Sequence, residues 1–271
     1  MLDRVESKGI KNAKHQFEML SERVRECCWG APEETLISLW IRRRRITMAN
    51  KPWLRTRAHF LTAGDEAELR TLTTGQRGRL THYRIREVLP VRGEAPVALV
   101  DGWRMVRIET PTPFSLSEDL LLPDGSSVLQ FHGVTQHLQY TSQVQREELN
   151  EHSRPELEPT GHTTAVLIPI GKSVEWWKLA LDQRQAYFEQ TQAAAGHIGI
   201  GLKYADRVFR QLYHSHSFHA ALSYDFLTYF EFQDTDEQVF RALLAELRDP
   251  RANPEWAYIT LEYEIWMTKI G

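Results

Sequence analysis

The chain has 271 residues, of which 42% are hydrophobic and 25% charged, with a formal net charge of -3. A chain of this length buries roughly 70 to 75% of its unfolded surface, so it can form one large domain or two small ones. The near-neutral charge provides no global basic field for nucleic acid or an anionic membrane surface. No apolar run reaches the roughly 20 residues of a membrane span, and the first residues lack a signal-peptide core. We therefore expect a cytoplasmic protein that binds neither nucleic acid nor membranes.

Residues 1–58 form an N-terminal extension of unknown role. It contains the only two cysteines, Cys27 and Cys28, which are too few for a disulfide framework or a four-thiolate metal site. A basic block, Arg42–Arg45, precedes Met48. A solvated charge run is the favoured interpretation of this block, and a nucleic-acid or targeting patch is the alternative. Met48 is also an alternative start of the native chain.

Residues 59–142 show strand patterns over 81–91, 102–109 and 126–141, with turns rich in Gly, Pro and Asp between them. No segment of this half has a helical period, so we predict a strand-rich, helix-poor N-terminal half. Residues 143–161 are polar and charged and include two prolines. This composition predicts a linker with at most one helical turn.

Residues 162–271 give the clearest pattern. An apolar run over 162–170 predicts a buried strand, and Ser173 can cap a long helix whose apolar face extends from Trp176 to Leu202. Alternating segments at 207–214 and 224–232, an amphipathic helix over 237–248 and a final alternating strand over 256–267 follow. The predicted order is β-α-β-β-α-β, the ferredoxin-like arrangement of an α+β domain.

Three glycines, Gly196, Gly199 and Gly201, surround His197 inside the predicted helix. Glycine in a helix interior costs about 1 kcal/mol relative to alanine, so this cluster needs a reason. Close approach of a flat group to the helix backbone is one reason, and a break in the helix is the other.

Strand alternation places Arg210 on the same face as Val208 and Leu212. Burying a guanidinium among apolar neighbours costs free energy unless an anion or hydrogen-bond acceptors pair with it. A structural ion pair with a glutamate of the same sheet is one solution, and a role in binding an anionic substrate is the other.

Three histidines, His214, His216 and His219, follow in the next turn and imitate a metal site. No cluster of carboxylates or thiols lies near them in the sequence. A polar hairpin rim is therefore the favoured interpretation over metal binding.

From about residue 59 onward, several motifs together resemble the chlorite dismutase family of haem proteins. Their order along the chain agrees with the family. They are HGVTQHLQYT at 132–141, VLIPIGKSVEWW at 166–177, HIGIGLKY at 197–204, RQLYHS at 210–215, YDFLTYFEF at 224–232 and LRDPRANPEWAYITLEYEI at 247–265.

The resemblance implies that His197 is the proximal ligand of haem b iron, with Lys172 and Glu255 as a pair close to that histidine. The segment before Glu255 is longer than the family pattern, which makes its assignment less specific. Arg210 matches the distal arginine, with Thr228 facing the same space. The aromatic residues that match those beside the porphyrin are Trp176, Trp177 and Tyr140.

The resemblance further implies the dimeric α+β barrel superfamily and conversion of the small anion chlorite to chloride and O2. The helix-poor N-terminal half resembles shorter, homodimeric members, and pentamers are the alternative. The family also contains coproheme decarboxylases, but those of the Gram-positive type typically lack the distal arginine. Arg210 and the Trp176–Trp177 pair therefore favour the chlorite-degrading branch. A haem-binding or peroxide-reactive protein without chlorite turnover is a third reading, since a fold hosts more than one function.

Overall fold

The computed structural model describes residues 54–76, 78–96, 99, 102–111, 128–136, 142–189, 191, 194–216 and 223–271. All of them belong to the compact unit Pro52–Gly271. The expectations for the two cysteines, the basic block and Met48 lie outside the described residues, as do those for Tyr140 and His219.

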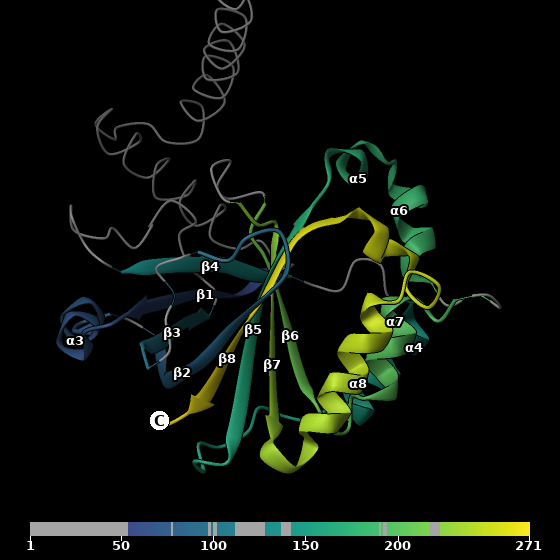
Figure 1. Cartoon of the computed structure of the whole chain (residues 1–271). Coiled ribbons are helices and arrows are strands. Elements are labelled where there is room, and N and C mark those ends of the chain that lie inside the picture. The colour runs from purple at the N-terminus through teal and green to yellow at the C-terminus, as the bar shows by residue number, and fades with distance from the viewer. Residues whose placement is uncertain are drawn as a thin grey trace, which may run out of the picture. The chain divides into compact units, whose positions relative to one another are not determined.

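Eight strands of the described chain close into one antiparallel barrel (Figure 1), in the order β1-β3-β2-β8-β5-β7-β6-β4. The four strands of the N-terminal half lie side by side, as do the four of the C-terminal half, and the barrel closes where β2 pairs with β8 and β4 pairs with β6. The α+β class expected from the sequence is confirmed. The strands are β1 (Leu54–Ala63), β2 (Arg79–Arg92), β3 (Arg104–Pro111), β4 (Leu129–Gln136), β5 (Thr163–Lys172), β6 (Phe209–His214), β7 (Phe226–Gln233) and β8 (Ile259–Lys269).

The C-terminal elements follow the expected strand and helix order, but three short helices replace the long one. They are α5 (Val174–Lys178), α6 (Leu181–Phe188) and α7 (Gly196–Lys203). Ser173 caps α5 as expected, by accepting a hydrogen bond from the Trp176 N–H. Extended residues at Leu179 and Glu189 end the first two helices. The helical periodicity therefore identified the right residues but missed the breaks between them.

Two helices occur where none, or at most a single turn, was expected. Helix α3 (Glu66–Thr73) begins at Asp65, which accepts a hydrogen bond from Ala67. Helix α4 (Gln143–His152) begins with a capping box between Ser142 and Gln145. No residue of α4 is buried, so the apolar stripe that usually marks a helix in a sequence is missing. Both N-terminal caps were present as local signals.

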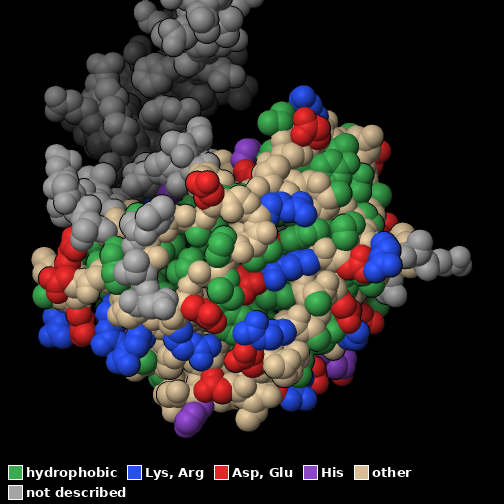
Figure 2. Space-filling model, in the orientation of Figure 1, with side chains coloured by type: hydrophobic (Ala, Val, Ile, Leu, Met, Phe, Trp, Pro, Cys, Tyr) green, Lys and Arg blue, Asp and Glu red, His purple; other side chains and the backbone are tan. Residues whose placement is uncertain are grey.

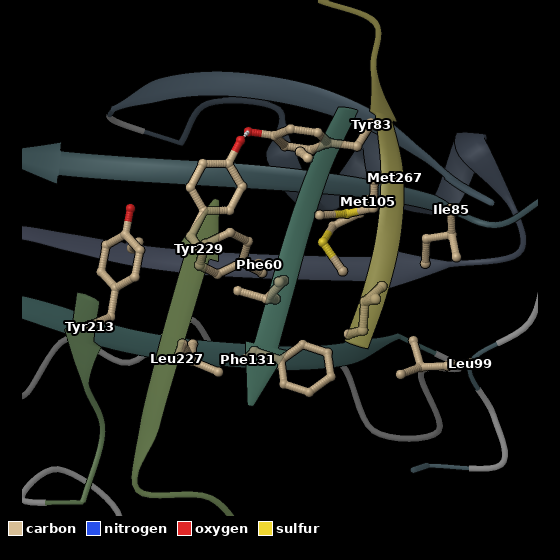
Figure 3. Close-up of a cluster of buried hydrophobic side chains, with 14 of the residues drawn as sticks. Phe60, Tyr83, Ile85, Leu99, Met105, Phe131, Tyr213, Leu227, Tyr229 and Met267 are labelled. Atoms are coloured by element: carbon tan, nitrogen blue, oxygen red, sulfur yellow. Dashed lines mark hydrogen bonds between the residues drawn. The ribbon is translucent and has the colours of Figure 1, made fainter. Parts of the chain in front are cut away.

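The interior of the barrel is filled by apolar and tyrosine side chains, shown in Figure 3. The Phe60 ring of β1 packs against Tyr213 of β6 and Tyr229 of β7, with ring centroids 5.7 and 5.9 Å away. The hydroxyls of Tyr83 and Tyr229 lie 2.9 Å apart and hydrogen-bond. This core fixes the inward face of β6 and β7.

The outward face of β5, β7 and β8 packs against helices. Helix α8 (Glu237–Arg248) inserts Phe240, Leu243 and Leu244 over Phe230 and Phe232 of β7. Helices α4, α7 and α8 lie together on this side of the barrel, at the right of Figure 1. Because side chains alternate along a strand, β6 and β7 direct one set of residues into the barrel and the other set toward these helices.

The charged surface has no single sign. Figure 2 shows Lys and Arg side chains beside Asp and Glu side chains among hydrophobic ones on the face that carries β2 and β8. Within the described part of the chain, no helix is both long and apolar enough to cross a membrane.

Candidate functional site

Three polar residues from distant parts of the chain meet at the start of α7. The Nδ1 atom of His197 lies 2.6 Å from one carboxylate oxygen of Glu255, and the Lys172 ammonium donates to the other. The Lys172 ammonium also lies 3.5 Å from the ring centroid of Trp176, a cation–π contact. Lys172 ends β5, His197 lies on α7 and Glu255 lies in a 3-10 turn, Pro254–Tyr258. The fold thus assembles all three residues that the motifs matched.

Charge in this triad is concentrated on Glu255. Burial alone would raise the pKa of the Glu255 carboxyl, but Lys172 and His197 together lower it to about 2. Burial lowers the pKa of His197, and Glu255 only partly opposes this effect. At neutral pH Glu255 is therefore a carboxylate and His197 a neutral imidazole. Since a carboxylate only accepts hydrogen bonds, the proton of His197 lies on Nδ1 and the lone pair on Nε2.

The elements that hold the triad are fixed by local chemistry. Gly196 starts α7 with a φ of 64°, and a Cβ there would lie 2.7 Å from the Phe188 carbonyl oxygen. Only glycine fits this turn, so the helix-break interpretation holds at this position. The Phe188 ring packs edge-on against His197 with centroids 4.6 Å apart.

The second half of the site is the outward face of β6 and β7. We call it the site face and define it by Arg210, Leu212, His214, Phe226, Thr228 and Phe230. The residues between them, such as Tyr213 and Tyr229, point into the barrel core. Strand alternation therefore predicted the orientation of Arg210 and Thr228 correctly.

Arg210 forms neither an ion pair nor a hydrogen bond with any residue that the structure describes. Its guanidinium carbon lies 5.8 Å from the ring centroid of Phe230, and burial lowers the pKa of Arg210. A guanidinium nevertheless stays protonated at neutral pH. Among the described residues, the structural ion pair that could have explained Arg210 is absent. A positive charge in this setting is suited to an anionic ligand.

Gly201 lies where Arg210 reaches α7. A Cβ at this position would lie 3.2 Å from an Nη atom of Arg210. His197 and Gly201 are four residues apart on the same helix, so they lie on one face, one turn apart. The close-approach interpretation of the glycine cluster therefore holds at Gly201, and what approaches is the arginine side chain.

The two tryptophans of the motif have different surroundings. Trp176 is 2% exposed and packs against Phe188, Tyr187 and Tyr258 as well as Lys172. Trp177 stacks on His216, with ring centroids 3.8 Å apart and planes 8° apart. It also stacks on Phe226 of the site face. Trp177 thus borders the site face, whereas Trp176 supports the triad from behind.

Sequence reasoning missed Asp225, which lies between Lys172 and His216. Asp225 accepts from the Lys172 backbone N–H at 2.6 Å, and its other oxygen lies 2.6 Å from Nδ1 of His216. His214 is half-buried on the site face. His216 packs on Trp177 and does not cluster with His214. The strand alternation that places Arg210 and Leu212 on one side of β6 also places His214 there.

The described residues contain no group of three or more His, Cys, Asp or Glu side chains placed to hold a metal ion by themselves. His219 lies outside those residues, so the interpretation of the three histidines as a polar hairpin rim stays a prediction. His197 offers a single nitrogen ligand, supported by a carboxylate. Such a donor suits a metal whose other ligands come from a cofactor.

The chain was compared with known proteins. A dimeric chlorite dismutase from Nitrobacter winogradskyi is 27% identical, with a TM-score of 0.54, and the match covers 77% of this chain and 99% of that one. A chlorite dismutase variant from Candidatus Nitrospira defluvii shares the fold at 20% identity, with a TM-score of 0.54 and coverage of 84% and 95%. None of the curated proteins matches. The family model described as chlorite dismutase matches residues 121–262, which is more than half of the chain. The chain therefore belongs to the chlorite dismutase family.

Proposed function

We propose that this protein is a haem b-dependent chlorite dismutase, which converts chlorite to chloride and O2. The observation that carries the proposal is a neutral histidine with an available Nε2, held by Glu255 and Lys172, on the helix that Arg210 also reaches. Family membership and the 27% identity with a dimeric chlorite dismutase support it. The same relative supports a homodimer as the assembly.

The residues present fit a haem group. His197 is 23% exposed, so its ring is partly accessible while its Nδ1 proton is engaged by Glu255. A histidine whose second nitrogen donates to a carboxylate is a stronger and better oriented ligand for iron. The site face offers Leu212 and Phe226 as apolar surface against which a flat macrocycle can pack. In this proposal Trp177 borders the macrocycle, and Trp176 supports the Lys172–Glu255 pair. The role of Tyr140 stays a prediction from the motif.

When bound, haem supplies the oxygen-atom chemistry at its iron. Arg210 attracts the chlorite anion electrostatically and orients it by the hydrogen-bond geometry of its guanidinium. It then retains the chlorine-containing anion in the site until chloride and O2 have formed. The Thr228 hydroxyl, which makes no hydrogen bond to a described residue, is available to donate to the same anion. Glu255 keeps the proton of His197 on Nδ1 throughout.

The test is O2 evolution from chlorite by the haem-loaded protein, measured with an oxygen electrode. We expect Arg210→Ala to lower kcat about 100-fold, the cost of removing a preorganised charge at the reacting centre, and to hasten bleaching of the haem. The His197→Ala variant, mixed with haem b, should lack the absorption band of a histidine-ligated ferric haem. Arg207→Ala is the matched control, because Arg207 is exposed and pairs with Asp236.

Equal O2 yield and equal haem survival in Arg210→Ala would contradict the role of the arginine. Conversion of iron coproporphyrin to haem with peroxide, without O2 from chlorite, would assign the protein to the decarboxylase branch instead. Tight haem binding without either activity would indicate a haem-binding protein.

A further inference from the structure

His214 is the remaining polar residue of the site face that the proposed function does not use. It lies at the end of β6, opposite Phe226, and its ring meets the Phe226 ring edge-on at 5.3 Å. The side chain is half-buried. Neither ring nitrogen forms a hydrogen bond or ion pair with any residue in the described part of the chain.

The imidazole is neutral under ordinary conditions. Burial, aided by the nearby Lys172 ammonium, lowers the pKa of His214 to about 4. A neutral imidazole has one N–H donor and one acceptor nitrogen. Partly buried polar groups usually find a partner, because leaving a donor without one costs free energy. A bound ligand can supply the partner that the described protein residues do not.

The position of His214 shows which part of a ligand it would meet. It lies four positions after Arg210 on the same strand face, which corresponds to about 13 Å between their backbones. A small anion held by Arg210 is too short to reach both. A ligand that spans the site face, with its centre opposite His197, would present its edge to His214.

The charges at the His214 end favour an acidic edge. The Lys172 ammonium lies 5.1 Å from the ring centroid of Phe226, the same ring that His214 contacts. Two carboxylates at this end are already engaged, Glu255 by Lys172 and His197, and Asp225 by His216 and a backbone N–H. A further carboxylate from a ligand would therefore find a donor at His214 and a positive charge close by.

We propose that His214 donates a hydrogen bond to a peripheral carboxylate of the tetrapyrrole and thereby selects acidic porphyrins and sets their orientation. This assignment rests on the proposed haem binding at His197 and adds the recognition of the porphyrin edge. His214 is a binding residue in this role and takes no part in the chemistry at the iron.

The experiment titrates haem-free protein with haem b, with its dimethyl ester and with iron coproporphyrin, following the haem absorption band. In His214→Leu, we expect haem b to bind about tenfold more weakly, as for a lost hydrogen bond to a charged group, and the ester to bind as in the wild type. His214→Gln keeps an N–H donor and should retain the preference for the acid over the ester. His162→Gln, at an exposed histidine, is the matched control.

The outcomes separate the two proposals. Equal weakening of the acid and the ester in His214→Leu, or no weakening of either, would overturn the role of His214 while leaving haem binding intact. A wild-type protein that gives no histidine-ligated haem spectrum would overturn the proposed function, and this assignment with it. A wild-type preference for iron coproporphyrin that His214→Leu also reduces would support carboxylate recognition and favour an acidic porphyrin as the native ligand.

Discussion

Glu255 is the residue on which the two basic groups of the site converge. Its two oxygens accept separately from His197 and Lys172, and both partners come from other elements. Because the carboxylate is buried, both contacts are needed to offset the free-energy cost of removing its charge from water. The motif around Glu255 is longer than the family pattern, yet the Glu255 side chain lies beside His197. A single carboxylate thereby sets the tautomer of the histidine and the charge of the site.

Replacing Glu255 with Gln should weaken haem binding about 10- to 100-fold, as expected for the loss of an outer-shell partner of a metal ligand. The amide cannot hold the proton of His197 on Nδ1 through a charge-assisted bond, and it leaves the Lys172 ammonium without its anion. Titration with haem b measures the effect. Glu262→Gln is the control, because Glu262 is buried but pairs with Arg248 instead. Unchanged affinity in Glu255→Gln would remove this carboxylate from the site.

At the scale of elements, α7 depends on the turn that precedes it. The backbone at Gly196 is left-handed and packs against the carbonyls that end α6. This turn separates α6 from α7 and directs His197 toward Glu255. The periodicity of apolar residues continues across the turn, which is why it predicted one helix instead of three. Periodicity reports which face is buried, and it does not report where the axis changes direction.

Gly196→Ala should lower the free energy of unfolding by at least about 2 kcal/mol, because alanine is strained at positive φ and its Cβ would meet the Phe188 carbonyl. Urea unfolding measures the loss. Gly75→Ala is the control, since Gly75 has a similar φ of 78° but nothing within 4 Å of a Cβ. Equal losses in the two variants would show that backbone strain alone matters and that the contact with α6 does not.

At the scale of the molecule, a charge network joins four barrel strands to the segment after α4. Glu156 pairs with Arg79, Arg107 and Lys269, which come from β2, β3 and β8. Lys269 also pairs with the buried Glu231 of β7. Arg107 is 1% exposed, so its positive charge must be paired with an anion of the protein. The segment containing Glu156, predicted as a linker, therefore contributes to the stability of the barrel.

Glu156→Gln should lower the free energy of unfolding at pH 7 by about 2 kcal/mol, because it removes the charge-assisted hydrogen bonds of Glu156, while Arg107 keeps Glu109 and Lys269 keeps Glu231. Burial alone would raise the pKa of Glu156, but Arg107, Arg79 and Lys269 together lower it to about 2. Its folded pKa thus lies below the unfolded value of 4.5. The stabilisation is present above about pH 4.5 and is lost as the pH falls toward 2.

Unfolding curves at several pH values test this expectation. The wild type should lose more stability than Glu156→Gln between pH 5 and about 2. Glu151→Gln, at an exposed position on α4, should follow the wild type throughout. Parallel pH profiles of the wild type and Glu156→Gln would contradict the assignment of the network.

The sequence by itself determined the family, the C-terminal order of elements and the face to which Arg210 and Thr228 point, because motifs and strand alternation are local properties. It missed α3 and α4, whose caps were visible but whose faces carry few or no buried residues. The tertiary structure brings together Lys172, His197 and Glu255, which the family resemblance predicted as neighbours, and it alone decided that Arg210 has no partner among the described residues. Contacts between residues 58 and 83 positions apart depend on how the barrel closes and how the helices pack, and no local pattern encodes them.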